Sequence, residues 1–312
     1  ELMELGYCSE AEAAAIAAGA ADEPTNNAAL HALGALSLSD AATDTNLKVD
    51  EVSATLGYPP DDFQKRCLSV INDASLDLLA MAPTGSGKTA VALMAILQAF
   101  RLGKRAVYTS PIKALSNQKY SEFRDWFAKR RIGAGVTLLT GDIKIRASPG
   151  TKHELIICTS EILRNKLVKN PDEPPPSPPA ADAATVQNHV GGMRDLDLDN
   201  LGCVISDEIH YINDADRGAV WEETLMHLPS NVQLVALSAT LHEPELFLEW
   251  IGRARGRPGK IVTRTDRHVP LHVGFLDRRR GEFQEFFGTH GEKKGHFDMN
   301  SYTDMCKRLL DP

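Results

Sequence analysis

From about residue 56 onward, short apolar runs alternate with stretches that have helical periodicity. Seven of the runs have the length of a strand, at 76–81, 105–110, 135–140, 154–159, 202–206, 232–238 and 260–264. Strands that are apolar almost throughout are typical of a parallel sheet that is covered by helices on both faces. The pattern therefore predicts an α/β domain with a doubly wound parallel sheet.

Three segments depart from this alternation. Residues 1–55 are rich in alanine and are predicted to be an N-terminal extension without chemistry of its own. A proline-rich segment at about 170–199 cannot continue a strand or a helix, so we expect a surface insertion within a domain that spans 56–275. Residues 276–312 are more polar and too few for a second α/β domain, and they are interpreted as a linker and the start of one.

The chain of 312 residues carries a formal net charge of −8, which argues against nonspecific coating of DNA. Local basic stripes can still bind nucleic acid. The stretch GRARGRPGK at 252–260 is interpreted as such a basic surface patch, with RNA as its candidate ligand.

No apolar run approaches the roughly 18 residues that a membrane span needs, so no membrane partner is predicted. Five cysteines without metal-ligand spacing favour a reduced intracellular compartment, with nucleus, cytoplasm and plastid all open. Because the first residue is Glu1 rather than Met, we expect a piece of a longer protein.

A glycine-rich turn, APTGSGKT, follows the first predicted strand. It consists of Ala82, Pro83, Thr84, Gly85, Ser86, Gly87, Lys88 and Thr89. Backbone N–H groups in such a loop, together with the N-terminus of the next helix, hold phosphate oxygens. Lys88 is expected to reach the β- and γ-phosphates, and Thr89 to ligate Mg²⁺. The turn therefore predicts a nucleotide site, although Ala82 stands where the common pattern has glycine.

An acidic pair follows the fifth predicted strand. Asp207 is placed to hold Mg²⁺ through its water shell, and Glu208 to take a proton from the attacking water. His210, counted with them as catalytic, is interpreted as a link to another part of the molecule. Ser238 and Thr240 end a further strand, where such hydroxyls on their own would usually cap a helix.

The elements APTGSGKT, DEIH and SAT, in this order, resemble superfamily 2 helicases of the DExH class. Other stretches are similar to the Ski-like RNA helicases, which feed RNA to the exosome: TSPIKALSNQKYSEF, TGD, TSEILRNKL, DEIHYINDADRGAVWEE and LPSNVQLVALSATL. The resemblance covers roughly 60–275, and plant-plastid relatives of the group fit nearly as well. It implies a P-loop NTPase fold, namely the first RecA-like domain of an ATP-dependent RNA helicase, with ATP and Mg²⁺ as cofactors.

The resemblance also assigns roles outside the phosphate loop. It implies that the amide of Gln64 hydrogen-bonds adenine with Phe63 packed nearby, and that Ser238 and Thr240 couple hydrolysis to movement. Single-stranded RNA is the implied partner, and the residues carried over to its path are Pro111, Lys113, Thr140, Gly141, Asp142, Thr159 and Ser160. Such contacts address the sugar-phosphate backbone, so little sequence preference is expected.

The family requires a second RecA-like domain in cis, which supplies arginine fingers, and no segment like QxxGRxGR occurs in the 312 residues. The helicase core is therefore incomplete, and we predict that this chain binds ATP weakly, hydrolyses it poorly and does not unwind RNA. The exosome or other RNA-processing cofactors are further partners that the resemblance implies. A DNA-directed DExH helicase and a non-catalytic nucleotide-gated scaffold are the alternative functions.

Overall fold

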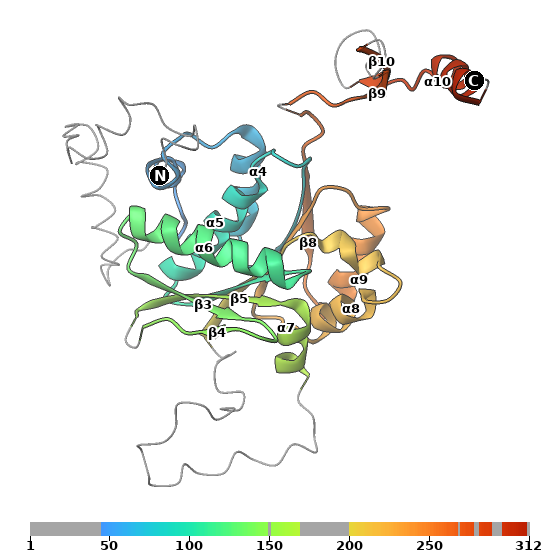
Figure 1. The fold of residues 1–312 in the computed structure, drawn as a ribbon. Coiled ribbons are helices and arrows are strands. Elements are labelled where there is room, and N and C mark those ends of the chain that lie inside the picture. Colours follow the sequence, from blue (N-terminus) through green and yellow to red (C-terminus); the bar gives the residue numbers. More distant parts are fainter. Residues whose placement is uncertain are drawn as a thin grey trace, which may run out of the picture.

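The computed structural model describes residues 45–148, 151–168, 200–267, 269–277, 281–288 and 295–310. The proline-rich segment lies outside these residues, as does most of the predicted extension. Figure 1 shows one domain built around a sheet, followed by a smaller C-terminal part that lies apart from it.

The sheet has eight strands in the order β4-β3-β5-β2-β6-β7-β1-β8. They are β1 (Asp77–Met81), β2 (Arg105–Ser110), β3 (Ala134–Leu139), β4 (Lys144–Ile145), β5 (His153–Thr159), β6 (Leu201–Ser206), β7 (Gln233–Ser238) and β8 (Gly259–Thr263). Only the pairing of β4 with β3 is antiparallel in this sheet. All seven predicted strands are present, each within one residue of its expected ends. The predicted α/β fold with a parallel sheet is confirmed.

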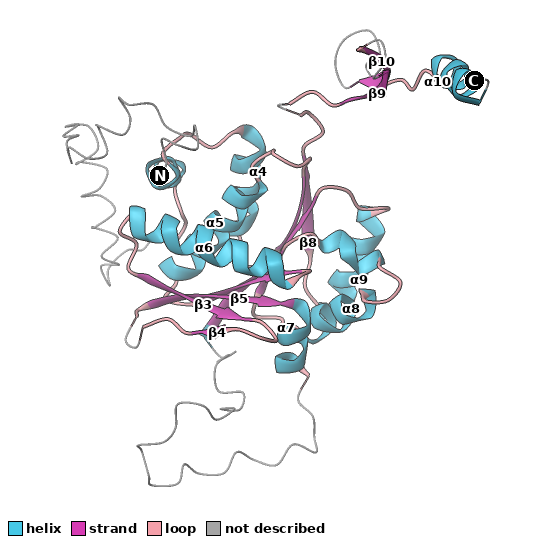
Figure 2. Cartoon of the chain, in the orientation of Figure 1, coloured by secondary structure: helices cyan, strands magenta, loops and turns pink. Residues whose placement is uncertain are grey.

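Helices cover both faces of the sheet (Figure 2). They are α3 (Val49–Leu56), α4 (Asp62–Asn72), α5 (Lys88–Arg101) and α6 (Lys113–Lys129) on one face, and α7 (Ser160–Leu167), α8 (Gly218–His227) and α9 (Pro244–Arg255) on the other. Alternate residues of a strand pack into the two different cores, because side chains along a strand point to opposite faces. In β1, for example, Leu78 and Ala80 pack under α4 and α5, whereas Leu79 packs in the second core.

Helix α3 lies within the range that the sequence suggested was an extension. Leu47 and Val52 are buried in the first core, 5% and 0% exposed. At the start of the helix the backbone N–H of Lys48 donates to Oε2 of Glu51 at 3.0 Å, and Gly57 ends the helix in the left-handed conformation. The packed domain therefore begins before residue 56.

A hairpin follows the domain, made of β9 (His272–Asp277) and β10 (Glu282–Gly288), and α10 (Met299–Leu310) comes after it. In Figure 1 these elements lie away from the eight-stranded sheet. The apolar pattern did not predict this hairpin. The interpretation of 276–312 as the start of a second RecA-like domain stays a prediction.

Parallel strands place all their carboxyl ends at one edge of the sheet, where ligands of open α/β sheets bind. The phosphate loop leaves this edge from β1, the acidic pair from β6, and Ser238 closes β7. The expected RNA-contacting segments leave the same edge from β2, β3 and β5. The topology thus gathers the predicted site residues on one side of the sheet.

Candidate nucleotide site and RNA path

The phosphate loop connects β1 to α5 through two residues with left-handed backbone. Gly85 and Gly87 have φ of 81° and 82°, which glycine adopts without steric cost, and Gly87 is the N-cap of α5. Ser86 is buried, and its hydroxyl has no hydrogen-bond partner among the described atoms. The N–H of Ala82 donates to the carbonyl of Ser238 at 3.0 Å, which joins the loop to the end of β7.

Lys88 folds back over its own loop. Its Nζ donates to the carbonyl oxygen of Ala82 at 2.8 Å and lies 3.4 Å from that of Pro83. Burial lowers the pKa of Lys88, and the positive charge of Arg267 acts in the same direction, while the carboxylates of Glu208 and Asp207 oppose them. The ammonium therefore lies in the field of the acidic pair, held by carbonyl dipoles.

Both carboxylate oxygens of Asp207 are held by the protein. Oδ1 accepts from the N–H of Glu208 at 3.0 Å, and Oδ2 accepts from the hydroxyl of Tyr108. Tyr108 lies on β2, buried, beside Ile205 of β6 in the sheet register. Burial and the charge of Asp207 raise the pKa of Tyr108 well above its ordinary value, so its hydroxyl stays a donor. Sequence reasoning did not identify Tyr108, since only the pairing of two strands reveals its partner.

Glu208 has an unusual backbone for a residue other than glycine, with φ of 51° and ψ of 49°. Its Oε2 is buried without a hydrogen-bond partner and lies 3.4 Å from Nδ1 of His210. The same Nδ1 lies 3.4 Å from Oγ of Ser238, which donates to the carbonyl of Thr240 at 2.8 Å. His210, in the short helix η2 (Ile209–Asn213), thus lies between the acidic pair and the end of β7.

Thr89 is exposed in the first turn of α5, where Lys119 of α6 reaches it. Nζ of Lys119 lies 3.4 Å from the hydroxyl of Thr89 and 2.8 Å from Oε2 of Glu122. Within the described ranges, no group of three or more His, Cys, Asp or Glu side chains is arranged to hold a metal ion. The hydroxyl of Thr89 and the carboxylate of Asp207 fit a Mg²⁺ site in which nucleotide phosphates and water would supply the remaining ligands.

Gln64 belongs to a capping box at the start of α4. Asp61 Oδ1 accepts from its N–H at 2.8 Å, and its own Oε1 accepts from the N–H of Asp61 at 3.1 Å. Its Nε2 lies 3.5 Å from the carbonyl of Gly87, and a Cβ added at Gly87 would clash with this nitrogen. Gln64 therefore contacts the phosphate loop directly. Phe63 is 3% exposed in the first core, so it supports α4 and offers no face to a nucleotide.

The segments expected to meet RNA lie on neighbouring strands, because β3, β5 and β2 are adjacent. Nζ of Lys113 pairs with Oδ2 of Asp142 at 2.6 Å, and a Cβ on Gly141 would come within 3.2 Å of that ammonium. Thr140 is buried and closes a turn by bonding both backbone groups of Ile143. The structure thus brings the segments after β2 and β3 together through an exposed ion pair.

The third segment begins α7. Thr159 is its N-cap without a side-chain capping bond, and Ser160 is buried. Pro111 accepts a hydrogen bond through its carbonyl from Arg217, at 2.8 Å. The guanidinium of Arg164, in the same stretch, is engaged by Glu223 at 2.5 Å.

The prediction of a basic surface patch at 252–260 is wrong for two of its arginines. Arg255 and Arg257 are buried, 5% and 8% exposed, and their Nε atoms lie 2.9 Å and 2.8 Å from the buried carboxylate of Asp77. Asp77 begins β1, at the opposite edge from the phosphate loop. Arg253 and Lys260 are the basic residues of this stretch that are exposed, and Arg253 is paired with Glu249. The arginines neutralise a buried acid, which the local sequence alone does not reveal.

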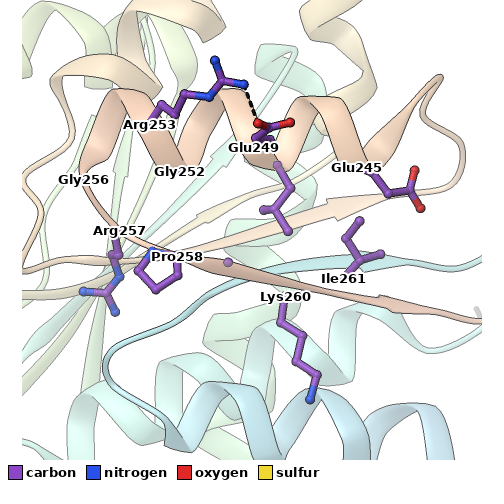
Figure 3. A pocket seen from close by; sticks show the side chains of 11 residues that line it. Glu245, Glu249, Gly252, Arg253, Gly256, Arg257, Pro258, Lys260 and Ile261 are labelled. Carbon is purple, nitrogen blue, oxygen red and sulfur yellow. Dashed lines mark hydrogen bonds and ion pairs between the residues drawn. The ribbon is translucent and has the colours of Figure 1, made fainter.

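A surface cavity of about 670 Å³ lies near these arginines, between α9 and β8 (Figure 3). Leu248 and Ile261 are among its lining residues, and Figure 3 shows Ile261 pointing from β8 towards α9 and the side chain of Lys260 pointing the other way. It lies against the outermost strand of the sheet, away from the loop that follows β1. This cavity is therefore separate from the candidate nucleotide site.

The fold and this arrangement define a P-loop NTPase domain with an Asp-Glu pair of the DExH type. A family model described as DEAD/DEAH box helicase matches residues 61–247, and the chain belongs to this family. Its resemblance to the Ski-like helicases is confirmed by relatives. The chain is 39% identical to superkiller complex protein 2 of Mus musculus over 69% of its own length and 14% of that protein's.

Two other relatives come from a plant and a bacterium. Identity is 36% to the chloroplastic DExH-box ATP-dependent RNA helicase DExH15 of Arabidopsis thaliana, covering 72% of this chain and 17% of that protein. Identity is 34% to the probable helicase HelY of Mycobacterium tuberculosis, and the match covers 81% of this chain and 24% of that protein. The chain therefore spans less than a quarter of the length of each of these relatives.

Among solved structures, the helicase MrfA bound to DNA is similar with a TM-score of 0.50 at 18% identity. The match covers 72% of this chain and 30% of that one. It bears on the fold alone, and it supports the helicase-type arrangement of the sheet. None of the helices in the described part of the chain is long and apolar enough to cross a membrane.

Proposed function

We propose that this chain is the ATP-binding half of an ATP-dependent DExH RNA helicase, which hydrolyses ATP to move along RNA and unwind it. One observation carries the proposal. Lys88, Asp207 and Glu208 meet at the carboxyl edge of the sheet, and Glu208 there keeps an oxygen without a hydrogen-bond partner. A buried, unsatisfied carboxylate oxygen is costly, and a catalytic base is a reason to retain it.

The residues divide the chemistry between them. The N–H groups from Gly85 to Thr89 hold phosphate oxygens, and Lys88 exchanges its carbonyl partners for the phosphates. Glu208 accepts the proton of the attacking water. Thr89 and, through water, Asp207 would hold Mg²⁺, which would supply positive charge that offsets the charge on the phosphates. Gln64 turns its amide from the phosphate loop towards adenine.

RNA is the proposed track. The printed names of two relatives, the superkiller complex protein and the chloroplastic RNA helicase, support RNA processing as the setting. Lys113, the turn at Thr140–Asp142 and the first turn of α7 offer charge and backbone groups, and these recognise a sugar-phosphate chain without reading bases. By family resemblance, the movement is 3′ to 5′. An exosome-type or other RNA-processing assembly is the proposed protein partner.

The domain organisation is part of the proposal. Of the extension predicted at 1–55, the part before α3 stays in the proposal, with a surface insertion at about 170–199 and with 276–312 as a linker into a second RecA-like domain that completes the ATP site with arginine fingers. Without those fingers, the 312 residues bind ATP weakly and turn it over poorly. An intracellular location, in cytoplasm, nucleus or plastid, goes with this function.

Substituting Glu208→Gln distinguishes an ATP-hydrolysing helicase from a non-catalytic nucleotide-gated scaffold. In the complete protein, the variant should lose ATP turnover and keep ATP bound, because the amide cannot take a proton. Turnover equal to the wild type would remove Glu208 from the mechanism. An unchanged cellular function despite lost turnover would favour the scaffold.

A competition experiment distinguishes RNA from DNA. A labelled single-stranded RNA bound to the protein is displaced with unlabelled RNA or DNA of the same base sequence. The proposal expects RNA to compete better, since the 2′-hydroxyl is the feature that separates the two backbones. Stronger competition by DNA would favour the DNA-directed helicase.

A further inference from the structure

Arg217 connects two of the segments that the proposed function assigns to RNA. It is the N-cap of α8, and its Nη2 donates to the carbonyl of Pro111 at 2.8 Å and to Oε1 of Glu161. Pro111 follows β2, and Glu161 lies in the first turn of α7. One planar guanidinium thus ties together the ends of two adjacent strands.

The backbone that carries Arg217 is fixed relative to the acidic pair. Only η2 and a short turn separate it from Glu208, and Asp214 Oδ1 accepts from the N–H of Arg217 at 3.0 Å within that turn. Gly218 follows, and a Cβ added there would clash with the carbonyl of Ile212. The guanidinium also lies over the ring of Trp221 at 5.7 Å. This tight turn fixes the backbone position of Arg217 relative to η2 and Glu208.

Glu161 shows why the contact matters for an anionic ligand. Burial alone would raise the pKa of Glu161. The hydrogen bond from Arg217 holds it below its ordinary value, together with hydrogen bonds from its own backbone N–H and from Thr159 and the positive charge of Arg217. The carboxylate is therefore ionised, in the helical turn where a phosphate is expected. While Arg217 neutralises it, the turn accepts an anion; without Arg217, Glu161 repels one.

Two further contacts hold α8 against α7. Arg164 pairs with Glu223 at 2.5 Å, and the buried hydroxyl of Thr224 lies 3.5 Å from the carbonyl of Ser160. These contacts keep the two helices packed when the contacts of Arg217 are removed. A variant at Arg217 therefore tests the position of the RNA segments and not the fold as a whole.

We propose that Arg217 is a positioning residue for RNA: it holds the turn at Pro111 and the first turn of α7 at the spacing of the RNA backbone, and it neutralises Glu161 beside the path. The proposal rests on the proposed function. It also links the RNA path to the acidic pair, because Arg217 and Glu208 flank the same short helix. The guanidinium acts through its two acceptors and does not itself contact the reacting atoms.

The test measures binding of a labelled single-stranded RNA by fluorescence anisotropy, with a fluorescent ATP analogue as the second readout. Arg217→Ala should raise the Kd for RNA about tenfold, because the turn at Pro111 and the first turn of α7 lose their shared guanidinium and Glu161 is left without its neutralising charge. Arg217→Lys should fall between, because an ammonium keeps the charge but lacks the planar fork. Arg253→Ala, which removes a similar Arg–Glu pair on α9, is the control and should bind RNA like the wild type.

Adding Glu161→Gln to Arg217→Ala should recover part of the lost affinity, because it removes the exposed negative charge. Wild-type affinity for RNA in Arg217→Ala would overturn the proposal, and so would an equal loss of RNA and ATP binding, which indicates general unfolding. Failure of the double variant to recover affinity would remove the role assigned to Glu161. If the wild-type chain binds no RNA, the proposed function falls, and the positioning role with it. If the wild type binds RNA and Arg217→Ala binds it equally well, only the positioning role falls.

Discussion

The hydroxyl of Tyr108 donates a hydrogen bond to Oδ2 of Asp207, across two adjacent strands of the sheet. The residue expected to hold Mg²⁺ is therefore oriented by the hydroxyl of a buried tyrosine. Ligating carboxylates are commonly held in this way, and the orienting partner tunes the affinity of the site.

Replacing Tyr108 with Phe should weaken the affinity for the Mg²⁺ that supports nucleotide binding. Asp207 loses its donor, and a hydrogen bond to a charged group contributes about 1.5–3 kcal/mol. We expect the Mg²⁺ concentration for half-maximal binding of an ATP analogue to rise several-fold, measured by titrating Mg²⁺ at fixed analogue. Tyr58→Phe, at a side chain that is exposed, is the control. An unchanged Mg²⁺ midpoint would show that Tyr108 does not orient the site.

Replacing Gly87 with Ala should damage the phosphate loop more than it damages an ordinary turn. Alanine there is strained at φ of 82°, and its Cβ meets the amide of Gln64. Gly103→Ala is a matched control, because Gly103 also has positive φ but open space around it. Both variants should lose about 1–2 kcal/mol of folding free energy from backbone strain. Only Gly87→Ala should also lose binding of the ATP analogue; similar binding by both variants would contradict the contact between Gln64 and the loop.

Replacing Asp77 with Ala should destabilise the domain strongly without a direct effect on the nucleotide site. It leaves Arg255 and Arg257 buried without their carboxylate, and breaking a buried pair from one side costs about 3–5 kcal/mol. Glu249→Ala breaks the exposed pair with Arg253 and should cost about 0–1 kcal/mol. Urea denaturation measures both. A loss below about 1 kcal/mol for Asp77→Ala would mean that the arginines are satisfied without it.

His153 should make the stability of the domain fall in mild acid. Burial, with a smaller effect of Lys152, lowers its pKa below the ordinary 6.5, and its ring stacks on Phe100 at 5.2 Å. The unfolded chain therefore binds the proton at higher pH than the folded chain does. The stabilisation is present above pH 6.5 and is lost as the pH falls below it.

Urea denaturation between pH 8 and pH 5 measures this, with His153→Gln compared with the wild type. The variant should be less stable at high pH and should lose less stability on acidification. His242→Gln, at a side chain 86% exposed, controls for the loss of an imidazole at the surface. Parallel pH profiles for His153→Gln and the wild type would exclude His153 as a source of the acid sensitivity.

The sheet could be predicted because each of its seven long strands is a continuous apolar run, and the loops that follow them carry recognisable motifs. Strand β4 has two exposed residues and the β9–β10 hairpin is mostly exposed, so neither leaves an apolar signal. The partners of Tyr108 and Arg217 depend on strand order, since their acceptors lie 99 and 106 residues away.

The charged residues show the limit of local patterns most clearly. Arg255 looks like part of a basic surface run, but its carboxylate partner stands 178 residues earlier, at the start of β1. Gln64 was assigned to adenine by its motif, while the structure adds a capping box and a contact with Gly87. Local sequence identified the type of chemistry, and the topology decided which groups meet.

Titration of the 312-residue chain with Mg·ATP, for the wild type and for Lys88→Ala, tests the central claim most directly. We predict weak but saturable binding by the wild type. We also predict at least a tenfold loss of affinity in the variant, because Lys88 gives charge-assisted hydrogen bonds to the phosphates. No ATP binding by the folded wild-type chain, or equal binding by both proteins, would contradict the assignment of this site to ATP.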